Sequence, residues 1–585
     1  MARPPGIRLL FLVLAAALYT FSLPLFLQGG DTSELVTAAY ARLVAHPPGY
    51  PLWVWLQNAW IHLSTWQTPF WRAALLNTTF SLTTLFLLTQ SRQGLWAATV
   101  IGTLLMLSPA FSEAAILPDV FALHGLFTAL ILWLYLSFDP ASRARQIALP
   151  LVFAIATAHH HTIVLLLPLV AAALWESLKA PSGIKRVGTA LFAGLAVSAL
   201  FYFSLFYLNP ESPHSWGRLV DFKSLVHHVL RVDYGTFSFS AGSQGLAPSS
   251  FWNLLSVSLL SFLAPLFFFL FLVLRDKAPV DRRTYWLGIS TLLSSAFLLL
   301  CTVPAHAIGA EVLLRFHLMP TVIVAFFTVH LAKGIEFNRQ RLILFLVFAL
   351  PGGLLFAPWS AQLPKLRHDS VIEDYARNLL REASVQGPSV ILTEGDHVLF
   401  SLRYLQVVEG IGTPVGLASG AMSLFPWYFE KLKIQVPELQ IPAIEEILKT
   451  KKLHIPSQLL TPNADRVGFF AARPFTDPRD TRITYQATGH RLAAGQGVDF
   501  DAASLAALKL RTRYLDVPRG PQAYTRGDVF AIYSQYYLMR GEWKNALEVV
   551  PYAAPAFDRL CQVEKASICF FSEAIKRAER GRKFF

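Results

Sequence analysis

The sequence has few charged residues and very few cysteines, and both shortages narrow the class of protein. Asp, Glu, Lys and Arg together make up 15% of the 585 residues, whereas hydrophobic residues make up 54%. A chain this apolar does not fit a soluble protein of several domains, and it indicates a polytopic membrane protein. Three cysteines exclude a disulfide framework, and only Cys561 and Cys569, both in the tail, are placed for a single bridge.

The formal charge of +13 does not indicate a nucleic-acid-binding protein. Such proteins gather Lys and Arg on a soluble face, whereas here these residues lie mainly in short loops between apolar runs. We also expect no cleavable signal, because Arg3 and Arg8 precede a long apolar run that no small-x-small site follows. We predict that this run is retained as the first span, with the N-terminus in the cytoplasm.

Eleven apolar runs are long enough to cross, or nearly cross, a bilayer. They lie at about 7–27, 72–90, 95–111, 119–138, 147–158, 162–176, 187–208, 251–274, 284–304, 316–333 and 341–358. The fifth and sixth runs pose a choice, because 147–176 is either one long span or two short spans hinged at three histidines.

Charge decides between these two topologies. With two spans, the basic loops around Arg143, Lys185, Arg283 and Arg341 nearly all face the cytoplasm, as the positive-inside rule requires. With one span, every later loop would change sides and break the rule repeatedly. We therefore predict about 11 transmembrane helices in an inner or plasma membrane, with the C-terminal tail on the extracytoplasmic side.

Two further helices are predicted in the first outer segment, 28–71. The stretches 32–45 and 52–63 have helical length and a mixed apolar and polar face, and the tryptophans around them suit the membrane interface. We expect both helices to lie on the bilayer surface.

The tail has a different pattern from the apolar part. Residues 363–384 have an amphipathic helical pattern, 389–393 a strand pattern and 396–408 a second helical pattern. Such alternation is typical of a soluble α/β fold.

These patterns divide the chain into two domains. Residues 1–359 are the predicted transmembrane domain, and 360–585 the extracytoplasmic domain. The second has an α/β part over about 360–470 and a helical part over about 525–585.

Two carboxylates follow the first apolar run, at Asp31 and Glu34. Their spacing is that of a capping box, with Asp31 as N-cap and Glu34 three residues later, and this role alone accounts for both. A carboxylate fixed where a span leaves the membrane can also take the proton of a hydroxyl that attacks a sugar carbon. We predict Asp31 as this base, and Glu34 as its cap partner or a substrate-binding group.

The stretch 46–51, His-Pro-Pro-Gly-Tyr-Pro, cannot be regular helix, because three prolines and a glycine make a stiff turn. It is either a tight connector or the floor of a binding site. Rigid non-helical chain at membrane depth is tolerated mainly where it lines a cavity. His46 and Tyr50 are therefore candidate substrate-binding residues.

Glu113 and Asp119 lie in or beside the next short outer segment. Asp119 is expected to cap the helix that follows it. Either acid is also a candidate second carboxylate, which would bind the acceptor or a metal. His124, one turn further along, is a candidate on the same face.

His159, His160 and His161 are adjacent, but adjacent residues on a helix point in different directions and cannot all bind one ion. A hydrogen-bonding role fits better, with His160 as the candidate that faces the site. No metal site is predicted, and the sequence leaves open whether a divalent ion takes part.

Arg315 precedes the tenth apolar run. Such a residue is either an interfacial anchor or a ligand for a lipid phosphate, which a guanidinium holds by two parallel hydrogen bonds. A transferase whose donor is a lipid-linked phosphate would need most of all to stabilise the leaving phosphate. Arg72 and Arg231 compete with Arg315 for this role.

Two of these motifs together resemble a known family. Polytopic proteins related to protein O-mannosyltransferases carry Gly-Asp-x-x-Glu-Leu followed by His-Pro-Pro-Gly-Tyr-Pro, and the same residues stand here at 30–35 and 46–51. Further likeness lies at 113–124, 158–162 and 395–410, the last beginning with Gly-Asp-His.

The resemblance implies a GT-C fold, a bundle of membrane helices whose first extracytoplasmic loop carries the catalytic acid. It implies a polyprenyl-phosphate sugar as donor and gives Asp31 the role of general base. The expected reaction is an inverting transfer of a hexose, with mannose favoured, to a Ser or Thr hydroxyl of an exported protein. Where the family pattern often has Glu-Val-Tyr, this chain has Asp119-Val120-Phe121, so Glu113 and Asp119 both stay candidates for the second acid.

Two other functions stay open on the sequence alone. The acceptor is alternatively a lipid or surface glycan, and buried ionisable groups with broken helices also suit a transporter or flippase of a polyprenyl-linked substrate. Transporters usually show internal repeats, and the two halves of this sequence have no matching Gly/Pro-interrupted spans. The expected partners are the bilayer, the lipid-linked sugar and an exported protein or glycan acceptor, without nucleic acid.

Overall fold

The computed structural model describes most of the chain up to residue 441 and short pieces beyond it. The described residues are 6–90, 95–179, 182–233, 260–276, 280–300, 314–333, 335, 338–384, 387–393, 396–419, 422, 425–441, 445, 459, 461–463, 466–471, 483–485 and 490–492. The helical part predicted at 525–585 and the two tail cysteines lie outside these residues.

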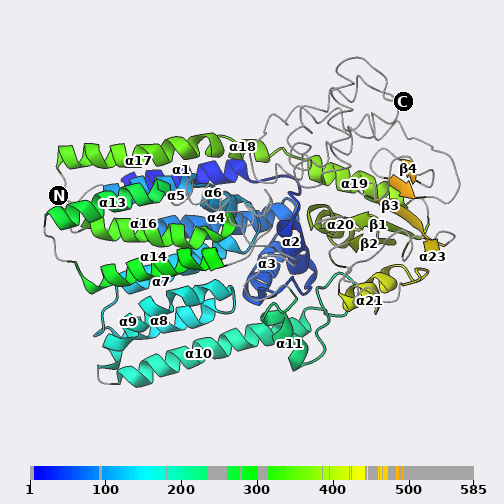
Figure 1. Cartoon of the computed structure of the whole chain (residues 1–585), viewed down its shortest axis with the longest axis horizontal. Helices are drawn as coiled ribbons and strands as arrows, with labels where there is room; N and C mark the ends of the chain where they lie inside the picture. The colour runs from blue at the N-terminus through cyan, green and yellow to red at the C-terminus, as the bar shows by residue number, and fades with distance from the viewer. Residues whose placement is uncertain are drawn as a thin grey trace, which may run out of the picture.

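Each predicted apolar run overlaps a long α-helix, and these helices run side by side through one half of the molecule (Figure 1). They are α1 (Gly6–Ser22), α4 (Pro69–Leu88), α5 (Leu95–Leu107), α7 (Phe121–Leu136), α8 (Arg143–Ala156), α9 (Leu167–Leu178), α10 (Gly183–Phe203), α13 (Leu260–Arg275), α14 (Arg282–Leu300), α16 (Leu318–Lys333) and α17 (Arg339–Ser360).

The helical half has the surface of a membrane protein. Large apolar side chains are exposed along it, for example Leu9 at 64%, Phe192 at 75% and Leu354 at 64%, as expected where lipid replaces water. Within the described residues, four helical stretches are long and apolar enough to cross a membrane. The pair α5 and α6 (Pro109–Ile116), bent by 69°, would make a fifth. The membrane class is confirmed, and the count of eleven spans stays a prediction.

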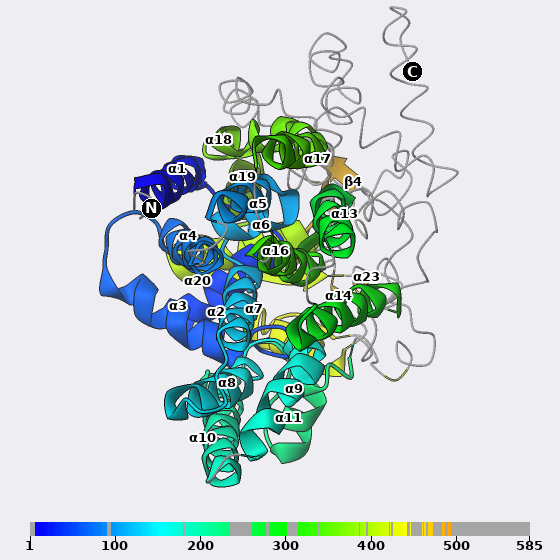
Figure 2. The ribbon, with the colours of Figure 1, turned by 90° about the vertical axis from the view of Figure 1, so that its left-hand side faces the viewer.

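Helices α8 and α9 form a hairpin instead of one long helix. A turn follows Ala156, and a short 3-10 helix, η1 (His161–Leu166), leads into α9. Arg186 Nη1, shortly after α9, donates to Gln146 Oε1 near the start of α8 at 2.9 Å. The two helices therefore begin and end at the same end of the bundle, and the predicted break at the histidines is confirmed. Viewed end-on, α8, α9 and α10 lie together on one side (Figure 2).

After α17 the chain forms a small α/β domain around a sheet of strand order β2-β1-β3-β5-β4. The central strand β1 (Ser389–Thr393) is parallel to β2 (Val415–Ser419) and β3 (Gly468–Ala471), whereas β5 (His490–Leu492) is antiparallel to β3 and β4 (Ile483–Tyr485). The helices around it are α18 (Leu363–Leu366), α19 (Val371–Ser384), α20 (Asp396–Glu409) and α21 (Pro426–Gln435).

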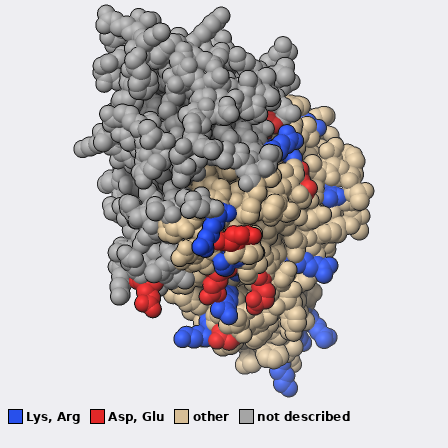
Figure 3. Space-filling model, turned by 90° about the vertical axis from the view of Figure 1, so that its right-hand side faces the viewer, with Lys and Arg blue, Asp and Glu red and all other residues tan. Residues whose placement is uncertain are grey.

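This domain has the surface of a soluble protein. The described part of the face that carries it shows basic and acidic side chains interspersed (Figure 3). The predicted strand at 389–393 is present, and the helix predicted over 396–408 is α20.

Helices α2 (Asp31–Ala41) and α3 (Pro51–Leu63) lie between the membrane helices and the α/β domain (Figure 1). Both were predicted, but the expectation that α2 lies on the bilayer surface is wrong. Residues 32–39 are all buried, and α2 packs against α3 and α20. Helix α20 of the C-terminal domain, hundreds of residues away in the sequence, covers α2. A local amphipathic pattern cannot reveal such a long-range contact.

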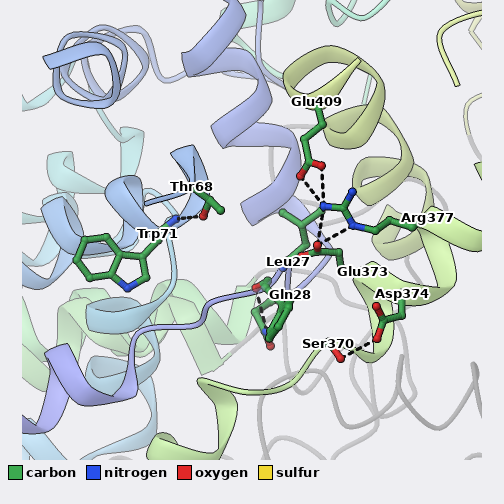
Figure 4. Close-up of polar contacts among 10 residues, drawn as sticks. Leu27, Gln28, Thr68, Trp71, Ser370, Glu373, Asp374, Arg377 and Glu409 are labelled. Atoms are coloured by element: carbon green, nitrogen blue, oxygen red, sulfur yellow. Dashed lines mark hydrogen bonds and ion pairs between the residues drawn. The ribbon is translucent and has the colours of Figure 1, made fainter. Parts of the chain in front are cut away.

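The linker between α1 and α2 is attached to the C-terminal domain as well (Figure 4). The Leu27 N–H donates to Glu373 Oε2 at 2.9 Å, and Gln28 Nε2 donates to the Asp369 carbonyl at 3.1 Å. Arg377 pairs with Glu373 at 2.7 Å. The chain that leads from α1 into Asp31 is thus hydrogen-bonded to the C-terminal domain.

Candidate active site

Asp31 is the first residue of α2, and its carboxylate forms an ion pair. Arg315 Nη1, from the segment that leads into α16, donates to Asp31 Oδ2 at 2.9 Å. The Asp31 side chain keeps 39% of its surface accessible and that of Arg315 keeps 14%. The pair therefore joins the first outer loop to the tenth predicted span, and its carboxylate is still open to a small molecule.

The electrostatic surroundings of Asp31 favour its ionised form. Burial among protein atoms would raise its pKa, but the charge of His46, whose own pKa is raised, and the charge and hydrogen bond of Arg315 outweigh burial and lower the pKa. Asp31 is therefore a carboxylate at neutral pH, ready to accept a proton but stabilised against doing so while Arg315 holds it.

The predicted capping box is wrong. The N-cap of α2 is Gly30, at φ 63°, and no side chain caps the helix. Glu34 instead binds the proline turn: its Oε1 accepts the His46 backbone N–H at 2.9 Å, and its Oε2 lies 2.9 Å from His46 Nδ1. The Glu34 side chain is only 3% exposed, so these two contacts fix the turn against α2.

The proline turn presents two rings to the site. The His46 ring lies 5.3 Å from that of Tyr50 and 6.0 Å from that of Trp216, edge to face in both cases. Tyr50 has φ 41° at the start of α3, and its ring stacks on His160 at 5.9 Å. Burial would lower the His46 pKa, but Glu34 and Asp31 outweigh it and raise it.

The three adjacent histidines have different partners. The His160 ring lies against that of His124, tilted by 33° with ring centroids 4.6 Å apart. Thr162 Oγ1 lies 2.7 Å from His160 Nδ1 and 3.1 Å from His124 Nε2. His159 instead contacts a backbone carbonyl through Nε2 at 2.8 Å. Of the three, only His160 stacks flat on Tyr50, and the described residues contain no group of three potential metal ligands.

Asp119 is the second acid that the structure places near Asp31. It is 2% exposed, its Oδ1 accepts the Phe121 N–H at 2.8 Å, and its charge interacts with those of Arg315 and Asp31. It thus contacts the start of α7 as predicted for a cap, although Val120 is the N-cap itself. Glu113 is buried in α6 at 7% exposure.

The two competing arginines differ in position. Arg72 in α4 is 9% exposed, and its Nε and Nη1 have no hydrogen-bond partner in the described part of the chain. It is not among the charges that act most strongly on Asp31. The charge of Arg231 acts on His46 and Tyr50, so Arg231 belongs to the proline-turn side of the site.

Sequence reasoning missed three residues that the fold brings here. Asp396 and His397 begin α20 and interact electrostatically with Asp31. Trp216, from the long outer segment, donates its backbone N–H to the Val44 carbonyl at 2.9 Å and packs on His46. The Gly-Asp-His likeness at 395–397 was a signal, but nothing local placed it against α2.

Comparison with known proteins gives matches in sequence. A family model described as the N-terminal domain of protein O-mannosyl-transferase TMEM260 matches residues 31–181. Protein O-mannosyl-transferase TMEM260 of Mus musculus is 29% identical over 458 residues, which is 73% of this chain and 64% of that protein. The tmem260 protein of Dictyostelium discoideum is 24% identical over 344 residues, 51% of this chain and 41% of that protein. The chain thus spans less than two thirds of the length of these curated relatives.

Solved structures match the fold. ArnT from Cupriavidus metallidurans in the apo state has a TM-score of 0.50 at 13% identity, covering 84% of this chain and 99% of that one. The same protein bound to undecaprenyl phosphate gives 0.50 at 14% identity with the same coverage. The chain is therefore similar in sequence to protein O-mannosyl-transferases and has the GT-C membrane fold, which confirms both expectations from the sequence.

Proposed function

We propose that this chain is a membrane glycosyltransferase that moves a hexose from a polyprenyl-phosphate donor to an acceptor hydroxyl on the extracytoplasmic side. The observation that carries the proposal is the Asp31–Arg315 pair at 2.9 Å, an accessible carboxylate beside a cation. The similarity to O-mannosyl-transferases supports mannose as the sugar and protein Ser or Thr as the acceptor. The ArnT structure with undecaprenyl phosphate supports a lipid-linked donor.

In the proposed reaction the acceptor oxygen forms a bond to the anomeric carbon while the bond from that carbon to the phosphate oxygen breaks. Asp31 takes the hydroxyl proton, and the polyprenyl phosphate leaves with the bonding electron pair. Attack from the face opposite the leaving group inverts the anomeric centre, by the same geometric logic as in inverting glycosidases. His46, Tyr50 and His160 form the wall against which the sugar rests.

Arg315 binds first the Asp31 carboxylate and then the donor phosphate. Without donor it holds Asp31, but a donor phosphate offers a second anion for the same guanidinium. Once Arg315 contacts the phosphate, its hold on Asp31 weakens and the Asp31 pKa rises. Donor binding would thus make the base stronger at the moment when a base is needed.

The arrangement of basic loops supports the extracytoplasmic side. Arg283 donates to the Leu136 and Phe138 carbonyls at 2.7 and 2.6 Å, and Arg341 pairs with Asp276 at 2.8 Å. These residues lie at the helix ends opposite to Asp31. By the positive-inside rule, that end faces the cytoplasm and the site faces outward.

The test uses the full-length protein in vesicles with polyprenyl-phosphate mannose and a library of Ser- and Thr-containing peptides. We expect release of polyprenyl phosphate and a hexose on the peptides, measured by mass spectrometry. Asp31→Asn should lower the rate about 1,000-fold, because general bases contribute about 100-fold to 10,000-fold.

Asp139→Asn is the matched control, since Asp139 is exposed at the opposite end of the helices. Its rate should equal that of the wild type. Transfer by Asp31→Asn at the wild-type rate would remove the base assignment. Movement of the donor across the vesicle without release of polyprenyl phosphate would indicate a flippase instead.

A further inference from the structure

The His397 side chain lies against the glycine that precedes the proposed base. A Cβ on Gly30 would lie 3.2 Å from both Nδ1 and Cε1 of His397. Gly29 is equally close, because its Cβ would lie 3.2 Å from the His397 carbonyl oxygen. Both glycines also have positive φ, at 75° and 63°. The start of α2 and the start of α20 are thus in direct contact, and the reaction described above does not use this ring.

The His397 ring has unused hydrogen-bonding capacity. Among the described residues, Nδ1 is buried without a hydrogen-bond partner and Nε2 has none either, and His397 as a whole is only partly buried. Burial, with the charge of Arg315, lowers the His397 pKa to about 4 despite Asp31. The ring is therefore neutral at pH 7. A proton on Nε2 avoids a buried, unpaired N–H at Nδ1, because an unpaired buried donor is costly.

The position of this N–H indicates the chemistry of its partner. It lies in the electrostatic range of Asp31 and Arg315. A neutral N–H suits a neutral oxygen, whereas a phosphate is better held by the Arg315 cation. Both substrates carry neutral hydroxyls at the reacting centre, on the donor sugar and on the acceptor.

We propose that His397 Nε2–H hydrogen-bonds a substrate hydroxyl, so that the C-terminal domain supplies one wall of the active site. The inference rests on the proposed function. It gives α20 a chemical role, and it explains why the linker before Asp31 is attached to Glu373 and Asp369 in the same domain. The hydroxyl belongs to the donor sugar or to the acceptor, and the experiment separates these two sources.

Three variants of the full chain test the role of the ring. His397→Phe keeps the packing against Gly30 without nitrogen, His397→Gln keeps an amide near the position of Nε2, and His397→Asn keeps one near Nδ1. We expect kcat/KM to fall about 10-fold to 100-fold in the Phe and Asn variants, and only a few-fold in the Gln variant. Equal losses in the Phe and Gln variants, or none in the Phe variant, would overturn the proposal.

Two measurements identify the hydroxyl. Polyprenyl-phosphate mannose should raise the unfolding temperature of the wild type, and a smaller rise in His397→Phe assigns the contact to the donor sugar. An unchanged rise with a higher KM for the peptides assigns it to the acceptor. Unfolding temperatures without ligand show that the variants fold, and His227→Phe, at an exposed histidine that pairs with Asp233, should behave as the wild type.

The two hypotheses fail in different ways. If the wild type releases no polyprenyl phosphate, the proposed function fails and this inference falls with it. If the wild type transfers sugar, Asp31→Asn does not, and His397→Phe equals the wild type, then only the role of His397 is disproved.

Discussion

Two aspartates begin helices on opposite sides of one interface, and their electrostatics are opposite. Asp31 begins α2 in the membrane domain and Asp396 begins α20 in the C-terminal domain, and each follows a glycine in the sequence. The two helices pack against each other. Yet the Asp31 pKa is lowered, whereas burial, together with the charges of Asp31 and Glu34, raises the Asp396 pKa to about 6.

The helix termini cannot cause this difference, because both carboxylates occupy the same position and a helix dipole contributes only about 0.3–1 kcal/mol. The two aspartates differ in the cationic side chains that contact them. Asp31 receives a hydrogen bond from Arg315 at 2.9 Å, whereas no described residue forms an ion pair with Asp396. The cation and not the helix start therefore distinguishes the proposed base.

Replacing Arg315 should have the largest effect on this comparison after loss of Asp31 itself. In Arg315→Gln the Asp31 pKa should rise, because the charge and the hydrogen bond of Arg315 are lost while burial stays. The acidic limb of the kcat/KM profile, which lies below the ordinary Asp value of 3.8 in the wild type, should move to higher pH. We expect kcat/KM at neutral pH to fall about 100-fold, because a cation at the leaving phosphate is also lost.

Arg341→Gln is the matched control, because Arg341 forms a similar pair with Asp276 at the other end of the bundle. Its pH profile should equal that of the wild type. Arg315→Lys should restore part of the rate, since it keeps the charge but not the two-pronged geometry. An unshifted acidic limb in Arg315→Gln would mean that this pair does not set the Asp31 pKa.

Replacing Glu34 should have a smaller effect, through the proline turn. Glu34→Gln loses the charge that raises the His46 pKa, and we expect about 10-fold slower transfer and about 1–3 kcal/mol lower stability. Because folding raises the His46 pKa above its unfolded value of 6.5, the protonated ring stabilises the folded protein fully when the pH is below 6.5. This stabilisation is lost as the pH rises through the pKa of the folded state. Thermal unfolding between pH 5 and 9 should show that pH dependence in the wild type and not in the variant.

Glu430→Gln serves as control for a surface charge. Glu430 pairs with Arg218 at 3.2 Å with both side chains more than half exposed, so the loss should be below about 1 kcal/mol. If both variants lost the same stability, the His46 contact would have no special role.

The comparison also shows what could be predicted from the sequence. Apolar length predicted the membrane helices, and strand and helix patterns predicted the start of the α/β domain, because both signals are local. The pairing of Asp31 with Arg315 spans 284 residues, and that of α2 with α20 spans more. Glu34 was predicted as the capping-box partner of Asp31, because spacing cannot show that a turn twelve residues later offers it a better partner. Asp396 and His397 were part of the family likeness, but their place beside Asp31 follows only from docking of the second domain.

The smallest predicted effect concerns Asp396. It tests whether the pKa of this carboxyl shifts in the opposite direction to that of Asp31. A carboxyl whose pKa rises from 3.8 to about 6 on folding binds a proton that the unfolded chain lacks in that window, so stability falls as pH rises through it. Above pH 6, the Asp396→Asn variant should therefore unfold at a higher temperature than the wild type. Near pH 4, the two proteins should unfold at the same temperature. The gain should be at most about 1 kcal/mol, because Asp396, although protein atoms around it raise its pKa, also keeps contact with solvent, which screens its charge. Asp31→Asn should change stability in the opposite direction at neutral pH, because it leaves Arg315 without its carboxylate. If both asparagine variants shifted the unfolding temperature in the same direction at neutral pH, the ionised carboxylates of Asp31 and Asp396 would not have opposite effects on stability.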